Sequence, residues 1–292
     1  MRSIRDIFTD IAIGFVLILT LILGNIAQIM TLIIYPFSRR AFFRTNRELA
    51  NAWWGLCVRI AGNMRKTPIV FHGDELDMLG NGIIITNHQS MTDILVIFEL
   101  AYRQKRLGDL KWFVKQSVKW VPGVGWGMQF LNCIFVKRDW KRDENRIAKA
   151  FYRLVKSKIP FYMVIFPEGT RIKPAKVAES VRFSEEHGLP VMNKVLFPRT
   201  KGFIATVKGL RQQIDAIYDV TILYNDHVPG LWQWFRGDTG LINVFVKRYA
   251  KDDLPDDPDS LSDWLIQRYM EKDELLSRGY KDTAENNWNY PG

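Results

Sequence analysis

The chain has 292 residues, of which 47% are hydrophobic and 25% charged, and its formal net charge is +10. This length is enough to bury a full core, and two cysteines exclude a disulfide framework. The basic charge fits an anionic membrane surface or phosphate-bearing substrates, because no recognition motif for nucleic acid accompanies it.

The first feature along the chain is the apolar run 11–35, which contains no charged residue. A helix of this length reaches ~36 Å, enough to cross a hydrocarbon core of ~30 Å. A secretory signal is the alternative, but the run is longer than a signal core and no small-residue cleavage site follows. We therefore expect a retained membrane anchor. The arginines that follow it favour a main domain on the cytoplasmic side.

The next segment, 41–64, mixes apolar residues at helical spacing with arginines. Such a helix is amphipathic, and its apolar face can lie on lipid or cover the core of a soluble domain. The sequence thus predicts a membrane anchor and amphipathic helix over residues 1–64, followed by a second domain over residues 65–292.

Beyond residue 64, short apolar runs alternate with longer segments of helical periodicity. The predicted strands are 69–71, 83–86, 112–114, 133–136, 161–166, 195–197, 218–223 and 242–246. The predicted helices are 93–106, 144–157, 176–186, 202–212 and 261–276. This alternation predicts an α/β domain with a mixed, mainly parallel sheet covered by helices on both faces, and active sites in such sheets gather at strand ends.

A histidine and an aspartate follow the strand 83–86. In one continuous helix, His88 and Asp93 would point about 140° apart, so they face each other only if His88 lies in the turn before the helix. A neutral imidazole held by a carboxylate is a general base. Because no serine or cysteine nucleophile lies in a recognisable setting nearby, this base would act on a hydroxyl group of the substrate.

The same residues also fit a purely structural interpretation. Ser90 and Asp93 have the spacing of a capping box, in which Asp93 reaches back to the helix start. An aspartate in the first turn is also favoured by the helix dipole. This segment alone therefore leaves the catalytic and the structural interpretations equally open.

A second motif lies at the end of the strand 161–166, where residues 167–171 read Pro-Glu-Gly-Thr-Arg. Gly169 permits a sharp turn, and the guanidinium of Arg171 suits a phosphate held by two hydrogen bonds. Glu168 would steer that guanidinium or contact the substrate. Taken alone, the segment also fits a strand-exit turn with a surface ion pair of little consequence.

Together, Asn-His-x4-Asp (the HX4D motif) and Phe-Pro-Glu-Gly-Thr-Arg (the EGTR motif) resemble the glycerolipid acyltransferase family, best known for the 1-acylglycerol-3-phosphate acyltransferases. Residues 132–138 and 195–202 are similar to two further blocks of this family. The segment 122–130 and the block 195–202 resemble most the eukaryotic-type branch with lysocardiolipin and lysophosphoinositide acyltransferases. Phe197 departs from the leucine that is commoner there. The resemblance spans roughly residues 53–249.

The resemblance implies a membrane-bound O-acyltransferase that takes a fatty acyl group from acyl-CoA or acyl carrier protein. The expected acceptor is a lysophospholipid, foremost 1-acyl-sn-glycerol-3-phosphate, which would become phosphatidic acid. No metal and no bound cofactor is expected, and the four histidines lack metal-ligand spacing. The implied site residues are His88 and Asp93 for catalysis, Arg138, Arg171, Lys115 and Lys137 for the acceptor phosphate, and Glu168, Gly169 and Thr170 for the substrate-binding turn.

Alternatives remain at this stage. A remodelling acyltransferase would act on lysocardiolipin, lysophosphatidylinositol or lysophosphatidylglycerol instead. A lipid-binding membrane protein would use the fold without catalysis, although a degenerate relative would be expected to lose His88 or Asp93. A lipid hydrolase is disfavoured, because the chain has no Gly-x-Ser-x-Gly elbow.

Two other features receive structural interpretations. The glycine-rich segment 123–127 resembles a dinucleotide fingerprint, but it follows a proline instead of a strand and its third glycine is misplaced. We expect it to be a tight, flexible segment against lipid or the acyl chain. Cys133 and Cys57 are expected to be buried and reduced, and an acyl-cysteine intermediate at Cys133 is disfavoured because no base lies beside it in sequence.

Overall fold

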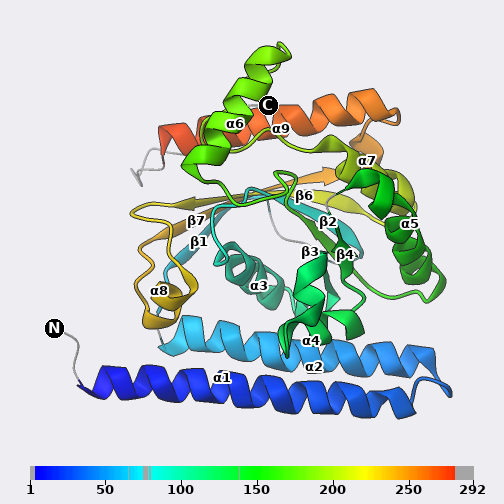
Figure 1. Ribbon diagram of the computed structural model, residues 1–292, viewed down its shortest axis with the longest axis vertical. Coiled ribbons are helices and arrows are strands. Elements are labelled where there is room, and N and C mark those ends of the chain that lie inside the picture. Colours follow the sequence, from blue (N-terminus) through cyan, green and yellow to red (C-terminus); the bar gives the residue numbers. More distant parts are fainter. Residues whose placement is uncertain (1–3, 65, 75–77, 79, 138, 280–292) are drawn as a thin grey trace. The chain divides into compact units, whose positions relative to one another are not determined.

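The computed structural model describes residues 4–64, 66–74, 78, 80–137 and 139–279 (Figure 1). The chain forms two compact units, each assembled from segments that are distant in sequence. The first unit comprises Met1–Thr67, Ile97–Phe161 and Leu231–Asp238. The second unit comprises Pro68–Val96, Tyr162–Gly230 and Thr239–Gly292. The sequence-based boundary between residues 64 and 65 stays a prediction.

The second unit contains strands in the order β1-β7-β6-β2-β5. Their bounds are β1 (Ile69–Gly73), β2 (Gly82–Thr86), β5 (Tyr162–Ile165), β6 (Ala216–Tyr224) and β7 (Ile242–Ala250). β2 pairs in parallel with both β5 and β6, and β1 pairs in parallel with β7, whereas β6 and β7 are antiparallel. The carboxyl ends of β5, β2 and β6 therefore meet at one edge, which brings together the segments that follow them.

The central strands of this sheet are buried almost throughout, so helices must cover them. Every residue of β2 is buried, which explains the uninterrupted Ile83, Ile84 and Ile85. The helices of this unit are α6 (Pro174–Glu186), α7 (Thr200–Leu210) and α9 (Pro258–Arg278), while α3 (Asp93–Arg103) begins here and continues into the first unit. Figure 1 shows α6 and α9 on the same side of the strands. The mixed, mainly parallel sheet predicted from the sequence is confirmed.

The long helix α9 is fixed to the sheet by buried polar contacts. The Tyr269 hydroxyl donates to the carbonyl oxygen of Thr86 at 2.9 Å, at the end of β2. Lys272 forms an ion pair with Asp219 of β6, and both side chains are fully buried. The Lys272 ammonium also donates to the carbonyl oxygen of Val220 at 2.8 Å and to the hydroxyl of Thr221 at 3.1 Å. These bonds satisfy donors that burial would otherwise leave unpaired.

The first unit is mainly helical. It contains α1 (Ile4–Met30), α2 (Arg39–Arg59), α4 (Val124–Phe130), α5 (Trp140–Lys156), α8 (Leu231–Arg236) and the parallel strands β3 (Leu110–Lys115) and β4 (Ile134–Val136). α1 and α2 form a helical hairpin, drawn in blue in Figure 1. The Ser38 hydroxyl caps α2 by accepting a hydrogen bond from the backbone N–H of Ala41 at 3.1 Å.

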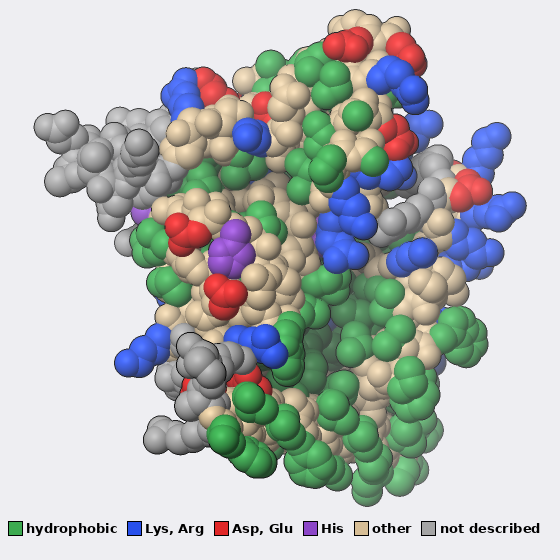
Figure 2. Space-filling view, turned by 60° about the vertical axis from the view of Figure 1, so that its left-hand side comes forward, with side chains coloured by type: hydrophobic (Ala, Val, Ile, Leu, Met, Phe, Trp, Pro, Cys, Tyr) green, Lys and Arg blue, Asp and Glu red, His purple; other side chains and the backbone are tan. Residues whose placement is uncertain are grey.

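Much of the apolar surface of α1 is exposed. The segment Asp6–Ile33 has a mean hydropathy of 2.4 and is long and apolar enough to cross a membrane. Only 11% of its most apolar window is buried, which distinguishes it from the core helix of a soluble protein. Hydrophobic side chains gather along the bottom of Figure 2, at the height of α1 in Figure 1. A contiguous apolar surface of this kind marks contact with lipid or with another protein.

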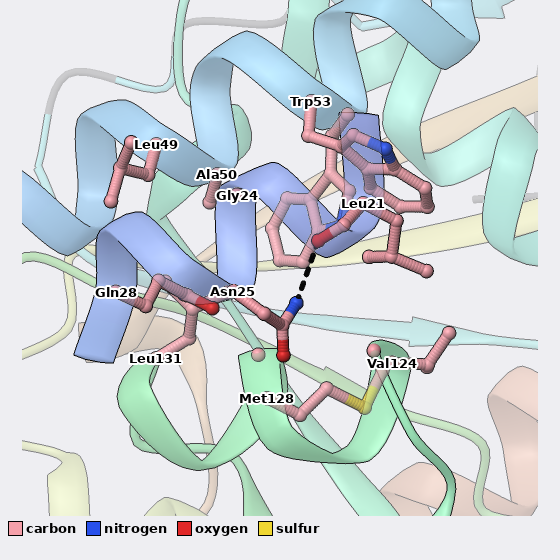
Figure 3. A pocket seen from close by; sticks show the side chains of 13 residues that line it. Leu21, Gly24, Asn25, Gln28, Leu49, Ala50, Trp53, Val124, Met128 and Leu131 are labelled. Carbon is pink, nitrogen blue, oxygen red and sulfur yellow. Dashed lines mark hydrogen bonds between the residues drawn. The ribbon is translucent and has the colours of Figure 1, made fainter. Parts of the chain in front are cut away.

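The inner side of α1 packs against α2 and α4. A narrow cavity of about 60 Å³ remains between these three helices. Figure 3 shows that Asn25 projects from α1 towards α4, while its amide donates back to the carbonyl oxygen of Leu21 on α1 at 3.0 Å. The Trp53 indole of α2 donates to the carbonyl oxygen of Leu17 at 3.3 Å. The Trp53 contact therefore joins the two helices of the hairpin, whereas the Asn25 contact lies within α1.

Two sequence-based assignments are wrong. Residues 195–197 are not a strand, because side chains take the backbone N–H groups that a ladder would need. The N–H of Val195 donates to Asp273 at 3.2 Å, and that of Leu196 donates to Glu168 at 3.2 Å. The N–H of Phe197 donates to the Ser180 hydroxyl at 2.8 Å. The glycine-rich segment 123–127, predicted to be tight and flexible, is helical instead, because α4 begins at Val124. α8 was not predicted.

Candidate active site

His88 lies in the turn between β2 and α3, and its imidazole faces Asp93. The distance from Nδ1 of His88 to Oδ2 of Asp93 is 2.9 Å. Asp93 is the first residue of α3, so the two side chains meet in the way that the five-residue spacing requires. Because the carboxylate accepts at Nδ1, the neutral ring has its free lone pair on Nε2. Nε2 has no hydrogen-bond partner among the described residues, and the His88 side chain keeps 14% of its exposure.

Asp93 is held by more than its histidine. Its Oδ2 atom also accepts hydrogen bonds from the backbone N–H groups of Gln89 and Ser90, at 2.6 and 2.9 Å. This is the reaching-back geometry of a capping box, so the structural interpretation of the motif is confirmed, while the catalytic one stays a prediction. The carboxylate is completely buried. Several donors around one buried carboxylate fix its orientation.

The second carboxylate oxygen of Asp93 binds a tyrosine at the end of β6. The Tyr224 hydroxyl donates to Oδ1 of Asp93 at 2.7 Å and lies 3.1 Å from the Thr92 hydroxyl. Burial, reinforced by the negative charge of Asp93, raises the pKa of Tyr224 well above its ordinary value. The hydroxyl therefore stays protonated and remains a donor to the carboxylate.

Glu168 lies beneath the histidine turn, where its carboxyl group holds two backbone segments. Oε1 accepts from the N–H of His88 at 2.8 Å, and Oε2 accepts from the N–H of Leu196 at 3.2 Å. Burial raises the pKa of this carboxyl to about 8, against the opposing effect of these two hydrogen bonds. Glu168 was predicted to steer Arg171 or to contact the substrate. Its observed partners are backbone groups, so its contact with His88 is one of positioning.

The rest of the Glu-Gly-Thr-Arg turn lies next to His88. Gly169 has φ +69°, and a Cβ atom there would approach the Arg199 side chain to 3.1 Å, so a larger residue would be strained. The N–H of Ile172 donates to the carbonyl oxygen of His88 at 2.9 Å, which places Arg171 one residue from that contact. Arg171 and Arg199 are exposed, and the half-buried Thr170 lies between Gly169 and Arg171.

The other basic residues predicted to hold phosphate belong to the first unit. Lys115 ends β3 and is paired in register with Val136 of β4, so Lys115 and Lys137 lie at the same end of these two parallel strands. Both lysines are exposed. Arg138 lies outside the residues that the structure describes. Within its own unit, each set of predicted residues therefore gathers at the carboxyl ends of parallel strands.

Several residues that support the site were not singled out from the sequence. The His88 ring stacks on Phe166, with 4.0 Å between ring centroids. The Asn87 side chain pairs with the backbone of Ile222, accepting from its N–H at 2.9 Å and donating to its carbonyl oxygen at 3.0 Å. The Ser90 hydroxyl donates to the carbonyl oxygen of Pro229 at 2.7 Å. Asn87 and Phe166 are the first residues of the two motifs, whereas nothing in the sequence points to Tyr224, Ile222 or Pro229.

Both cysteines are buried and free. Burial raises the pKa of the Cys133 thiol to about 11 and that of Cys57 to about 12. A thiol of this kind is a poor nucleophile at neutral pH, because the thiolate is the reactive form. This agrees with the expectation that Cys133 does not form an acyl intermediate.

Comparison with known families and structures agrees with this architecture. Residues 68–225 match the family described as Acyltransferase, and residues 233–287 match the one described as Acyltransferase C-terminus. The first match covers the histidine turn and the Glu-Gly-Thr-Arg turn, and the second covers α9. The crystal structure of the 1-acyl-sn-glycerophosphate (LPA) acyltransferase PlsC from Thermotoga maritima has a TM-score of 0.57 at 17% identity. That similarity covers 97% of this chain and 100% of the PlsC chain, and it shows the fold.

Relatives with closer sequences are found in plants and mammals. The 1-acyl-sn-glycerol-3-phosphate acyltransferase 3 of Arabidopsis thaliana is 30% identical over 283 residues, covering 92% of this chain and 73% of the relative. The 1-acyl-sn-glycerol-3-phosphate acyltransferase delta of Rattus norvegicus is 32% identical over 279 residues, covering 91% and 72%. The chain therefore belongs to the glycerolipid acyltransferase family and is an O-acyltransferase.

Proposed function

We propose that this protein acylates the free hydroxyl of 1-acyl-sn-glycerol-3-phosphate and forms phosphatidic acid, with an acyl thioester as donor. The observation that most supports this proposal is the contact between His88 and Asp93 beside the turn that ends in Arg171. The names of the relatives support the same acceptor. The thioester belongs to acyl-CoA or to acyl carrier protein, and neither brings a resident cofactor.

The proposed chemistry begins at Nε2 of His88. This nitrogen takes the proton from the acceptor hydroxyl while the hydroxyl oxygen attacks the thioester carbonyl carbon. Asp93 fixes the tautomer and stabilises the imidazolium that forms. As the carbon–sulfur bond breaks, the thiolate receives the proton from Nε2. The acyl group passes directly to the acceptor, so no acyl-enzyme intermediate forms, in agreement with the raised pKa of the Cys133 thiol.

The phosphate of the acceptor is the group that the basic residues recognise in this proposal. Arg171 supplies a guanidinium with no partner among the residues that the structure describes, next to the histidine turn. Arg138, Lys115 and Lys137 are the further phosphate contacts, and Gly169 and Thr170 shape the substrate-binding turn. Charge-assisted hydrogen bonds of this type contribute ~1.5–3 kcal/mol each.

The protein is proposed to act at a membrane, with the α1–α2 hairpin as its anchor and the second unit on the cytoplasmic face. The exposed apolar surface of α1 supports the anchor. Arginines near the start of α2 support the cytoplasmic orientation, since positively charged flanks stay on that side.

The direct test is an assay of the full-length protein in detergent, with lysophosphatidate and labelled acyl-CoA or acyl carrier protein. We expect labelled phosphatidic acid, and we expect His88→Ala to reduce its formation by about 10²-fold or more. The matched control is His187→Ala, an exposed histidine at the end of α6. Free fatty acid as the main product would indicate a hydrolase, and no turnover of any lysolipid would indicate a lipid-binding protein.

A remodelling acyltransferase is the second candidate, because residues 122–130 and 195–202 resemble the eukaryotic-type branch. The same assay distinguishes the two when the acceptor is varied at constant acyl chain. Faster acylation of lysocardiolipin, lysophosphatidylinositol or lysophosphatidylglycerol than of lysophosphatidate would assign the remodelling function.

A further inference from the structure

A basic cavity lies in the first unit, under the turn that joins α1 and α2. It has a volume of about 530 Å³, within the range of small-molecule sites. The start of α2, the start of β3 and the residues just after α5 form its wall. Its basic lining residues are Arg40, Arg44, Arg47, Lys111 and Lys158, and its lining residues include no aspartate or glutamate.

The positive charge in this cavity is only partly balanced. Arg47 is paired with Asp109, with 2.7 Å between Nε and Oδ1, and the buried ammonium of Lys111 donates to the carbonyl oxygen of Gly108 at 3.0 Å. In contrast, the other three basic side chains have no carboxylate within 4 Å among the residues described. These are Arg40, Arg44 and Lys158. Unpaired cations around a concave surface create a site for an anion.

The position of the arginines at a helix start strengthens this argument. Arg40 lies in the first turn of α2 and Arg44 in the second, and the first turn contains no acidic residue. Cations near a helix N-terminus are unfavourable, because the helix dipole is positive there. An anion bound at this end would interact favourably with both the helix dipole and the two arginine side chains.

Apolar surface adjoins the basic cavity. A second cavity of about 430 Å³ shares the lining residues Phe43, Phe130 and Asn132 with it, and its further lining residues include Ile29, Phe42 and Trp126. Outside the cavities, the connection between α1 and α2 exposes Ile33 and Phe37, which are 71% and 86% exposed. A basic pocket next to an apolar one, beside exposed apolar side chains, matches a molecule with an anionic head and a hydrocarbon tail.

We propose that this cavity binds the phosphate of an anionic phospholipid of the bilayer, and that the neighbouring apolar cavity takes part of its acyl chain. Arg40, Arg44 and Lys158 hold the phosphate, and Phe43 separates the two compartments. This site differs from the one proposed for the acceptor. Lys111 and Lys115 are at opposite ends of β3, ~13 Å apart at ~3.3 Å per residue. The bound lipid fixes the hairpin at the membrane surface and takes no part in the reaction.

Native mass spectrometry of the full-length protein, purified in neutral detergent with added phosphatidylglycerol, tests for a specific site. A micelle of neutral detergent has no surface potential, so retained lipid reports binding in a pocket. We expect the wild type to retain about one phosphatidylglycerol. Arg40→Gln/Arg44→Gln should reduce its affinity about 10-fold or more. The control Lys141→Gln/Lys149→Gln removes two exposed charges from α5 and should retain the lipid.

Flotation with vesicles tests the same site at a bilayer. For phosphatidylcholine vesicles with 30% phosphatidylglycerol, the arginine variant should lose about 10-fold more affinity than the lysine variant. The affinity of both variants for vesicles of pure phosphatidylcholine should equal that of the wild type. Thermal melting verifies that both variants are folded. Equal losses in the two variants, or no retained lipid in the wild type, would mean diffuse surface charge and overturn the proposal.

Competition identifies the source of the phosphate. Inorganic phosphate or coenzyme A at millimolar concentration should leave the phosphatidylglycerol in place, because neither occupies the apolar compartment. If coenzyme A displaced the lipid at equimolar concentration, the cavity would be a site for a soluble phosphate compound and the lipid assignment would be wrong. These measurements record binding alone, so they stand or fall independently of the acyl transfer reaction.

Discussion

The Tyr224 hydroxyl donates a hydrogen bond to Oδ1 of Asp93 at 2.7 Å, although the two residues are 131 positions apart in sequence. Asp93 binds His88 through its other oxygen, so the three side chains form a chain from the end of β6 to the imidazole. The tyrosine therefore has the geometry of a residue that fixes the orientation of the carboxylate. A site defined by the histidine and aspartate alone omits this contact.

Replacing Tyr224 by phenylalanine should separate positioning from binding. The variant keeps the ring but leaves Oδ1 of the buried Asp93 without this donor, and a hydrogen bond to a charged group contributes ~1.5–3 kcal/mol. We expect kcat to fall about 10-fold or more, with KM for both substrates within about twofold. Tyr152→Phe, at an exposed position on α5, is the control. A change in KM alone would assign Tyr224 to substrate binding instead.

Arg171→Ala should affect one substrate more than the other. If its guanidinium binds the acceptor phosphate, the KM for the lysophospholipid should rise about 10- to 100-fold, while the KM for the acyl donor changes little. Arg171→Lys should recover only part of the loss, because an ammonium lacks the planar fork. Steady-state kinetics with each substrate varied in turn give the comparison, with Arg182→Ala on α6 as the control. Equal effects on both substrates would contradict a phosphate contact.

Glu168 should make stability depend on pH. Its pKa is raised from 4.5 in the unfolded chain to about 8 in the fold, so folding favours the protonated form. Its contribution to stability is fully present below about pH 4.5 and is lost progressively as the pH rises through about 8. The glutamine of Glu168→Gln cannot ionise, so the free energy of unfolding of this variant should not fall for this reason as the pH rises. Urea unfolding of both proteins from pH 5 to 9 should therefore show the wild type weakening relative to the variant. A constant difference across this range would show that Glu168 does not titrate there.

The buried pair of Lys272 and Asp219 gives a prediction for stability. Lys272→Met leaves the Asp219 carboxylate buried without its cation, and breaking such a pair costs ~3–5 kcal/mol. The double variant Lys272→Met/Asp219→Leu removes both charges and should be more stable than the single variant. Chemical unfolding of four proteins, the wild type, Lys272→Met, Asp219→Leu and the double variant, measures this coupling. If the double variant were as unstable as the sum of the two single changes, the ion pair would contribute no coupling energy.

The sequence predicted much of the fold because β2 and β5 in the middle of the sheet are short, apolar runs. The buried run Ile83–Ile85 and the run before Pro167 were assigned from local pattern, and both are strands in the structure. The same pattern failed at Val195, Leu196 and Phe197. Those residues are as apolar as a strand, but their N–H groups bind side chains from α6, α9 and the Glu168 turn. Apolar periodicity reports burial and does not report which acceptors a backbone finds.

The candidate site divides in the same way. The contact of His88 with Asp93 was predictable, because both residues belong to one turn and one helix start, and local geometry determines whether they meet. The carboxyl of Glu168 reaches the backbone of His88 from 80 positions away, and the Tyr224 hydroxyl reaches Asp93 from 131. Such contacts depend on which strands pair, here β2 between β5 and β6, and strand order results from packing of the whole sheet. Sequence alone therefore determined the pairing of His88 with Asp93, whereas tertiary structure decided what holds that pair in place.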